Sequence, residues 1–309
     1  MRDRKLTSLF VATGLLLSLP LAVGALGSSK LGDHPGNHRE RTSGAGPADI
    51  SAYEGLGIWL DMFNARPWRS PENAVEKMWE HGTRTIYVET SNFSQRFSIF
   101  KPEEMGRLIE AAHARDMNVV AWYLPSFKNI HKDLKRSKAA IEFESPSNER
   151  FDSFALDIES TEVADITTRN ERAISLSKRI RRFTGDDYPL GAIIPDSAGQ
   201  LYWPFFPYAS LYEYYDMFLP MGYYTYRTSG YEGVLRYTKR NVQIIRDEIG
   251  DETVPVHVIG GLAGSATKAE VKAFVAAAVK KKAMGGSLYD YPIMKEWEWT
   301  KLQPLRELE

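Results

Sequence analysis

The sequence contains no cysteine, so disulfide bonds and a cysteine-linked lipid anchor are excluded. Its net charge is only −1 at pH 7, which gives no basic excess for nucleic acid and no acidic excess for a cationic partner. The six histidines are scattered, and no P-loop or zinc-type spacing occurs. We therefore expect no metal and no other cofactor. Stability has to come from a hydrophobic core, for which 43% hydrophobic residues in 309 are ample.

Only the N-terminus carries a long uncharged run. A basic start at Arg2, Arg4 and Lys5 precedes residues 6–29, a pattern typical of a secretory signal or of an uncleaved membrane anchor. Residues 30–52 are rich in Gly, Ser, Pro and charge, which predicts a flexible linker. We expect a secreted or cell-surface protein whose membrane contact, if any, is limited to residues 1–29. The folded domain then covers 53–309, and a monomer is the default expectation.

From residue 54 onward, eight short apolar runs recur, each ending in a polar or turn residue. Helical patterns separate most of them, so the chain alternates between strands and helices. Eight such units predict a single α/β domain, a closed (β/α)8 or TIM barrel. An open doubly wound sheet is the alternative, but no glycine fingerprint follows the first run. The predicted strands are 55–61, 83–90, 117–125, 151–159, 188–196, 215–223, 254–261 and 285–291.

The helix signals differ in strength along the chain. Residues 70–82 have Ser70 as a predicted N-cap, Pro71 in the first turn and Gly82 as a stop. Apolar spacing also predicts helices over 101–117, 165–183, 231–249 and 267–283. The helix around 131–145 is weakly marked, and an aromatic-rich loop replaces a clear helix after the fifth strand.

Carboxyl groups end five of the eight predicted strands. In a TIM barrel the active site lies at these ends, and no Lys or Arg stands there to neutralise the acids. Capping of the following helix would explain some aspartates, but Glu is a poor N-cap. Asp157 and Glu159 lie two residues apart, so a strand would point both to one face, where repulsion raises a pKa for proton donation. The acids are Asp61, Glu89, Asp157, Glu159, Asp196 and Asp290.

Aromatic side chains accompany these acids. Twelve of the 25 residues from 202 to 226 are aromatic, and Trp59, Trp122, Tyr223 and Tyr224 lie on or beside strand ends. Flat apolar faces with polar rims suit sugar rings, whereas phosphate would favour Arg and Lys. His257 is the only strand histidine, and we expect it in the core rather than as a ligand in a metal-dependent deacetylase. The pattern favours a glycan as the partner.

Residues 151–159, FDSFALDIE, resemble the fourth-strand motif F-D-G-x-D-x-D-x-E of the family 18, chitinase-like glycoside hydrolases. The resemblance implies a TIM barrel with Glu159 as general acid and Asp157 positioning the substrate N-acetyl group, whose carbonyl attacks the anomeric carbon. Met221 and Tyr223 match the family's sixth-strand motif M-x-Y-D, which implies a sugar-binding or transition-state role for Tyr223. The motif differs at Ser153, Ala155 and Tyr224, and the third-strand S-x-G-G and the eighth-strand tryptophan are absent.

A second resemblance leaves the mechanism open. The sequence LDIE, Leu156 to Glu159, is similar to the L-D-x-E of the family 25 muramidases, and Asp61 matches their first-strand Asp. We therefore predict an exported glycoside hydrolase that acts on a polysaccharide, with Glu159 as general acid/base and Asp157 assisting it. A polysaccharide that contains N-acetylhexosamine is one candidate substrate. The alternatives are a muramidase-like cell-wall hydrolase and a non-catalytic carbohydrate-binding barrel. Predicted substrate contacts are Tyr223, Tyr224, Trp59, Trp122, Asp61, Glu89, Asp196, Asp290 and Met221.

Overall fold

Eight parallel strands form one sheet in the order β6-β5-β4-β3-β2-β1-β8-β7. The computed structural model describes residues 48–309, and the predicted signal 1–29 and most of the predicted linker lie outside this range. Single parallel bridges, Phe218 to Val256 and Met221 to Ile259, connect β6 to β7, so the sheet curls into a nearly closed barrel. This confirms the predicted (β/α)8 barrel, and the alternative of an open doubly wound sheet is wrong.

The observed strands lie within the predicted runs with two exceptions. β2 continues to Asn92, with an irregular register between Glu89 and Ser91, and β7 continues to Leu262. β4 ends at Asp157, so Glu159 lies two residues beyond it. The strands are β1 Gly55–Leu60, β2 Thr85–Asn92, β3 Asn118–Leu124, β4 Ser153–Asp157, β5 Leu190–Ile194, β6 Met217–Pro220, β7 His257–Leu262 and β8 Gly285–Tyr289.

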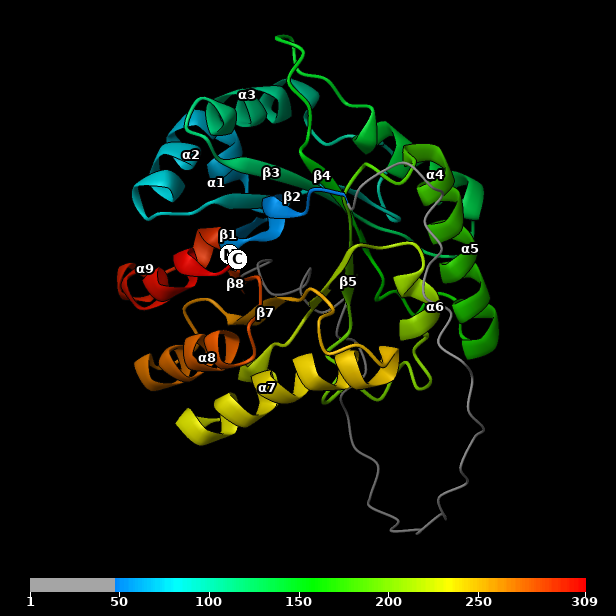
Figure 1. Ribbon diagram of the computed structural model, residues 1–309. Helices are drawn as coiled ribbons and strands as arrows, with labels where there is room; N and C mark the ends of the chain where they lie inside the picture. The colour runs from blue at the N-terminus through cyan, green and yellow to red at the C-terminus, as the bar shows by residue number, and fades with distance from the viewer. Residues whose placement is uncertain (1–47) are drawn as a thin grey trace, which may run out of the picture. The chain divides into compact units, whose positions relative to one another are not determined.

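Helices surround the strands (Figure 1). The weakly marked third helix exists as α4, whereas only the short α6 follows β5. Ser70 occupies the N-cap of α2 and Pro71 its first turn, as predicted, although the Ser70 side chain makes no capping hydrogen bond. The helices are α1 Ala65–Arg69, α2 Pro71–Glu80, α3 Pro102–His113, α4 Ile130–Ile141, α5 Ile166–Thr184, α6 Tyr208–Tyr212, α7 Gly230–Ile249, α8 Lys268–Lys280 and α9 Glu296–Leu302. The 3-10 helices are η1 Ser51–Tyr53, η2 Tyr224–Tyr226, η3 Tyr291–Ile293 and η4 Gln303–Glu307.

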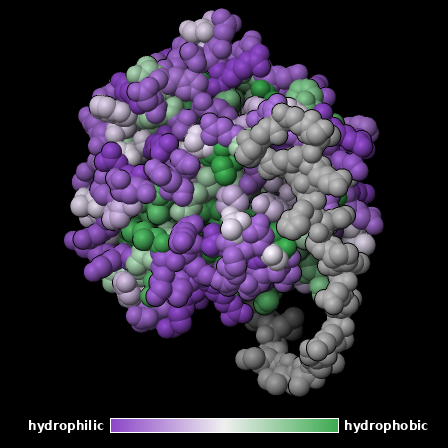
Figure 2. Space-filling view, in the orientation of Figure 1, coloured by the Kyte–Doolittle hydropathy of each residue, from purple (hydrophilic) through white to green (hydrophobic). Residues whose placement is uncertain are grey.

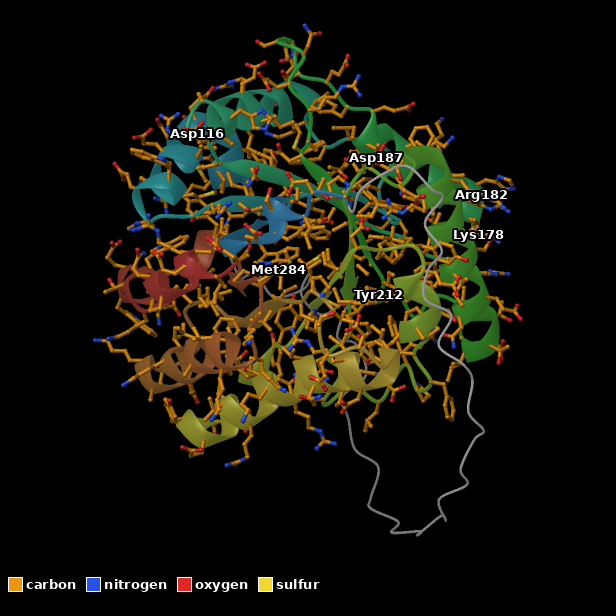
Figure 3. All side chains as sticks on the ribbon, in the orientation of Figure 1. Asp116, Lys178, Arg182, Asp187, Tyr212 and Met284 are labelled. Carbon is orange, nitrogen blue, oxygen red and sulfur yellow. The ribbon has the colours of Figure 1, made fainter. Side chains whose placement is uncertain are left out.

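Strand side chains alternate between two cores. On β4, Phe154 and Leu156 join the larger core between strands and helices, whereas Ala155 points into the barrel. The barrel interior is filled by aromatic, aliphatic and sulfur-containing side chains, and Met284 lies near the middle of the ring of strands (Figure 3). This filling makes the barrel a packed support for its rim and not a pore. The interior includes Tyr53, Trp59, Tyr87, Val120, Trp122, Ile193, Met217, Leu219, Met221 and Ile259.

The helices present their polar sides outward. The face shown in Figure 2 is largely hydrophilic, with small hydrophobic areas between the polar ones. Lys178 and Arg182 extend from α5 on the outside of the ring (Figure 3). Within residues 48–309, none of the helices combines the length and the apolar character that crossing a membrane requires.

A histidine bridge stabilises the end of the barrel where the strands begin. His113, the last residue of α3, contacts Glu149 Oε2 at 2.6 Å through Nδ1 and Asp152 Oδ2 at 3.1 Å through Nε2. Asp152 Oδ2 also accepts a hydrogen bond from the backbone N–H of Val119 at 2.7 Å. The hydrogen bond to Asp152, and then that to Glu149, raise the pKa of His113 to about 9. The protonated imidazolium therefore connects α3 to the segment that leads into β4.

The His113→Gln variant tests this bridge. Because the folded pKa lies above the unfolded value near 6.5, the stabilisation is complete below pH 6.5 and is lost as the pH rises through 9. We expect the variant to lose about 1 kcal/mol of unfolding free energy at pH 6, discounted for partial exposure, and much less at pH 10. Urea denaturation at both pH values measures the loss, with the exposed His131→Gln as control. Equal losses at both pH values would contradict the bridge.

Candidate active site

Asp157 and Glu159 lie at the rim of the barrel, where β4 ends. The Asp157 side chain is 5% exposed, and its Oδ1 has no hydrogen-bond partner within residues 48–309. Burial, followed by the charges of Glu159 and Glu89, raises the pKa of Asp157 well above its ordinary value. Burial also raises the pKa of the partly exposed Glu159 to about 7. Near neutral pH a substantial fraction of Glu159 is protonated, as a general acid requires.

Glu89 lies beside this pair and is almost fully buried. Its Oε2 accepts a hydrogen bond from the backbone N–H of Met62 at 3.3 Å, and its Oε1 accepts one from Asn92 Nδ2 at 3.0 Å. Burial raises the pKa of Glu89 to about 8, and the charges of Asp61 and Glu159 contribute in the same direction. Glu89 is thus mainly neutral at pH 7, which reduces the repulsion that Glu159 would otherwise meet.

Asp61 and Asp290 form a second carboxyl pair, between β1 and β8. Asp61 Oδ1 accepts backbone N–H bonds from Phe63 at 2.9 Å and Asn64 at 3.2 Å, and Oδ2 accepts one from the Tyr289 hydroxyl at 3.3 Å. Burial, the charge of Asp61 and a hydrogen bond with Asp61 raise the pKa of Asp290 to about 8. Asp61 therefore stabilises the turn after β1 and also forms a hydrogen bond with Asp290.

Aromatic side chains surround the carboxyl groups. Trp59 is buried and stacks on Tyr87 with ring centroids 4.5 Å apart, and its Nε1 donates to Ser287 Oγ at 2.8 Å. Trp122 is 6% exposed, and its Nε1 has no hydrogen-bond partner in the described part of the chain. Tyr223 packs against Tyr289 at 6.0 Å. Burial, then the charges of Glu159 and Asp157, raise the pKa of the Tyr223 phenol well above 10, so it remains a hydroxyl donor near the acids.

Two other predicted contacts lie in different surroundings. Asp196 is buried after β5, but its Oδ2 accepts a hydrogen bond from Arg227 Nε at 2.8 Å and another from the Tyr237 hydroxyl. The expectation that no cation neutralises a strand-end acid is therefore wrong at Asp196. Tyr224 points away from the rim, because it is fully buried against Phe274 of α8, with centroids 5.9 Å apart. The structure does not bring Tyr224 to the carboxyl groups.

Met221 and His257 belong to the barrel interior. Met221 is 7% exposed and packs among the inward-pointing side chains below the rim. His257 contacts the Tyr53 carbonyl at 2.8 Å and Ser287 Oγ at 3.0 Å, and burial lowers its pKa to about 4. It is therefore a neutral core histidine, as predicted. Within residues 48–309, no group of three or more His, Cys, Asp or Glu is placed to hold a metal ion.

Sequence reasoning did not select three residues that the structure brings to this rim. Tyr289 donates to Asp61, and Arg227 pairs with Asp196. Tyr202 lies in the loop after β5 and is 38% exposed, but partial burial of its phenol and then the charges of Glu159, Asp196 and Asp157 raise its pKa far above 10. Tyr289 directly precedes Asp290, so its place in the sequence beside a predicted strand-end acid was a signal for a role at the rim. Nothing in the spacing relates Tyr202 or Arg227 to the acids, because long loops carry both of them.

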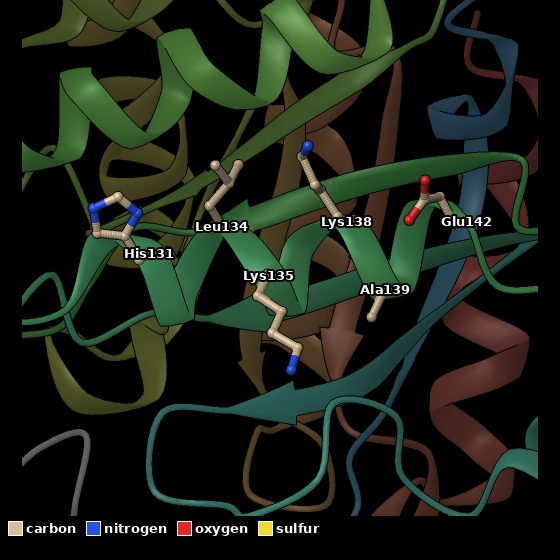
Figure 4. Close-up of a pocket in the computed structure, with 6 residues that line it drawn as sticks. All are labelled: His131, Leu134, Lys135, Lys138, Ala139 and Glu142. Atoms are coloured by element: carbon tan, nitrogen blue, oxygen red, sulfur yellow. The ribbon is translucent and has the colours of Figure 1, made fainter.

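A surface hollow on α4 is separate from this site. It is lined by side chains of that one helix and contains none of the strand-end carboxyl groups (Figure 4). Its lining includes Lys135, Lys138 and Glu142, and Lys138 Nζ lies 4.1 Å from the centre of the Phe183 ring. The hollow is lined by a single carboxyl group, that of Glu142, so the candidate site remains the carboxyl-rich rim.

Solved structures share this fold, although no family model and no curated protein matches the chain. An endo-β-1,4-mannanase from Thermotoga petrophila aligns over 77% of this chain and 68% of its own, with TM-score 0.59 and 10% identity. A chitinase from Rhizomucor miehei aligns over 82% and 100%, with TM-score 0.56 and 11% identity. A spore cortex-lytic enzyme from Bacillus cereus aligns over 81% and 74%, with TM-score 0.59 and 8% identity. Identities this low establish the barrel fold.

The Glu89→Gln variant tests the electrostatics of the rim. The pKa of Glu89 in the folded protein, about 8, lies above the unfolded value near 4.5, so its proton stabilises the fold at low pH. This contribution is complete below pH 4.5 and is lost as the pH rises through 8. We expect the Tm difference, variant minus wild type, to increase by about 5 °C between pH 5 and pH 9.

Calorimetry or circular dichroism melting at the two pH values measures that difference. The exposed Glu103→Gln on α3 is the matched control, and its difference from wild type should stay constant. A Glu89→Gln difference that is independent of pH would show that Glu89 is ionised throughout this range.

Proposed function

We propose that the chain is an exported glycoside hydrolase that cleaves a polysaccharide containing N-acetylhexosamine, with Glu159 as general acid/base. The observation that carries the proposal is a pair of unsatisfied polar atoms on the neighbouring strands β3 and β4, and Glu159 lies two residues beyond the end of β4. Asp157 Oδ1 is an unpaired acceptor and Trp122 Nε1 an unpaired donor within the described residues, and both side chains are more than nine-tenths buried. Unpaired buried polar atoms are costly, so a ligand group that satisfies both is favoured.

An acetamido group has the required polarity. Its N–H can donate to Asp157 Oδ1, and its carbonyl oxygen can accept from Trp122 Nε1 or from the Tyr223 hydroxyl. The neighbour of Trp122 across the sheet is Ala155, and both residues point into the barrel. The small Ala155 side chain stands where the family 18 motif has a second acid. We infer that Trp122 supplies on β3 a polar contact that those enzymes make with other residues.

The reaction follows from these contacts. Glu159 donates its proton to the glycosidic oxygen while the acetamido carbonyl oxygen attacks the anomeric carbon, so the C–O bond to the leaving sugar breaks as the new one forms. Asp157 accepts the acetamido N–H and stabilises the positive charge that develops on the group. The Glu159 carboxylate then takes a proton from water, which attacks the anomeric carbon and releases the acetamido oxygen. The protonation state of Glu159 is restored.

The fold likeness supports this class of reaction. The aligned structures bear the names of a mannanase, a chitinase and a spore cortex-lytic enzyme, and a further one is called a family 18 N-acetylglucosaminidase. Export remains part of the proposal, since it depends on residues 1–29. A non-catalytic carbohydrate-binding barrel is the other candidate, because Ala155 departs from the motif. A binding protein, however, would have no need of a proton donor with a pKa near 7.

The first test is the Glu159→Gln variant. Loss of the proton donor should lower kcat on an N-acetylated polysaccharide by about 10²- to 10⁴-fold, without loss of folding or glycan binding. Reducing-end release and calorimetric binding measure the two properties. Glu162→Gln is the matched control, because Glu162 lies three residues further on, at the surface, where it pairs with Lys128 at 2.5 Å. If the Glu159→Gln variant kept the wild-type kcat, the assignment of Glu159 as general acid/base would be wrong.

A second test concerns the acetamido group. N-acetylated oligosaccharides should be cleaved, whereas fully deacetylated ones of the same length should not, because they lack the attacking carbonyl. A thiazoline mimic of the cyclised intermediate should inhibit. Trp122→Phe retains an aromatic ring and removes the N–H donor, so kcat/KM on the N-acetylated substrate should fall by about tenfold. Cleavage of the deacetylated oligosaccharide at a comparable rate would exclude participation of the acetamide.

A further inference from the structure

Arg227 is a positively charged residue beside the acidic rim. It follows η2, the short 3-10 helix after β6, and its side chain is 29% exposed. The guanidinium reaches Asp196 through Nε, which donates to Oδ2 at 2.8 Å. Nε makes the hydrogen bond to Asp196 and the Tyr237 hydroxyl also lies beside the guanidinium, so the terminal nitrogens Nη1 and Nη2 are not used in the bond to Asp196. An arginine held in this way presents a fixed pair of donors.

The surroundings of Arg227 fix its orientation. Asp196 is 5% exposed, and its Oδ2 also accepts the Tyr237 hydroxyl bond from α7. Gly199 provides the space in which the arginine lies, since a Cβ atom there would be 3.3 Å from both Cδ and Nε of Arg227. A surface arginine that only balanced the charge of Asp196 would not require a second hydrogen bond to that carboxylate. It would also not require a glycine packed against its aliphatic side-chain carbons.

Arg227 lies on the same side of the rim as the proposed proton donor. Asp196, the partner of Arg227, opens the loop after β5, and β5 pairs in parallel with β4 so that Ile193 lies opposite Asp157. Trp203 anchors this loop, because its Nε1 donates to Asn170 Oδ1 on α5 at 2.6 Å. Arg227 is thus held at the rim beside the end of β4, and Glu159 lies two residues beyond that end. A group bound to Arg227 would belong to a sugar next to the cleaved bond.

We propose that Arg227 binds the carboxylate of an acidic sugar, so that the substrate is a carboxylate-bearing N-acetylated glycan. This inference rests on the proposed function and specifies its substrate class. Two parallel N–H donors match the two oxygens of a carboxylate, which a neutral hydroxymethyl group cannot reproduce. Glu89 and Asp290, with pKa values of about 8, are mainly uncharged at pH 7 and repel such a substrate little.

The experiment compares two forms of one glycan. Peptide-free strands of alternating N-acetylglucosamine and N-acetylmuramic acid carry a free lactyl carboxylate, and chemical reduction converts it to an alcohol. Wild type should cleave the carboxylated strand with the higher kcat/KM. Arg227→Gln should lower kcat/KM on the carboxylated strand at least about tenfold and on the reduced strand less than about threefold. An equal loss on both strands, or a wild-type preference for the reduced one, would overturn the inference.

Two further variants distinguish binding from folding. Arg227→Lys keeps a cation beside Asp196 but lacks the planar pair of donors, so its loss on the carboxylated strand should be intermediate. Tyr237→Phe removes the second hydrogen bond to Asp196 and leaves the guanidinium in place. This variant should therefore change kcat/KM on the carboxylated and the reduced glycan strand by the same factor. If Arg227→Lys also changed kcat/KM on both glycan strands by the same factor, the role of Arg227 would be structural and not in substrate binding.

A binding measurement separates this inference from the proposed function. In the Glu159→Gln background, calorimetry should show tighter binding of the carboxylated strand, and adding Arg227→Gln should remove the difference. If wild type cleaves neutral N-acetylated chains and binds both strands equally, the inference fails and the proposed function stands. If wild type cleaves neither strand nor a neutral N-acetylated chain, the proposed function fails and the inference with it.

Discussion

The removal of water from carboxyl groups at the barrel rim is the constraint on which the rest of the site depends. Asp157, Glu89 and Asp290 are each at least nine-tenths buried, and burial is the first cause of every raised pKa among them. A packed interior of aromatic, aliphatic and sulfur-containing side chains contributes to this burial, because it excludes water from beneath the rim. The same interior that holds the barrel together thus prepares Glu159 to carry a proton at neutral pH.

The barrel itself could be predicted from the sequence because its signals are local and repeated. Eight apolar runs separated by helical patterns suffice for the topology, and a carboxyl group at the end of a strand is brought to the rim by the fold alone. For that reason Asp61, Glu89, Asp157, Glu159 and Asp290 were predicted together and lie together. The interactions among these carboxyl groups follow from the order of the strands in the barrel. The alternation of strand and helix patterns in the sequence predicts that order.

The remaining contacts depend on loops and on the direction of single side chains. Tyr223 and Tyr224 are adjacent in the sequence, yet one reaches the acids and the other packs on α8. The turn into η2 decides this, and composition contains no signal for it. Arg227 reaches Asp196 across 31 positions, through a loop and a glycine whose role only coordinates reveal. Such pairings require tertiary structure, because neither residue type nor spacing distinguishes them from solvated surface charges.

The histidine bridge and the rim acids have a common consequence for the whole molecule. Both the imidazole of His113 and the carboxyl groups of Glu89 and Asp290 hold protons in the folded state that the unfolded chain would release near neutrality. Folding is therefore accompanied by net proton uptake at these groups, which lie at opposite ends of the barrel. By linkage, a mildly acidic medium stabilises both ends of the barrel at once, and a cationic ligand at the rim would have to displace protons in order to bind.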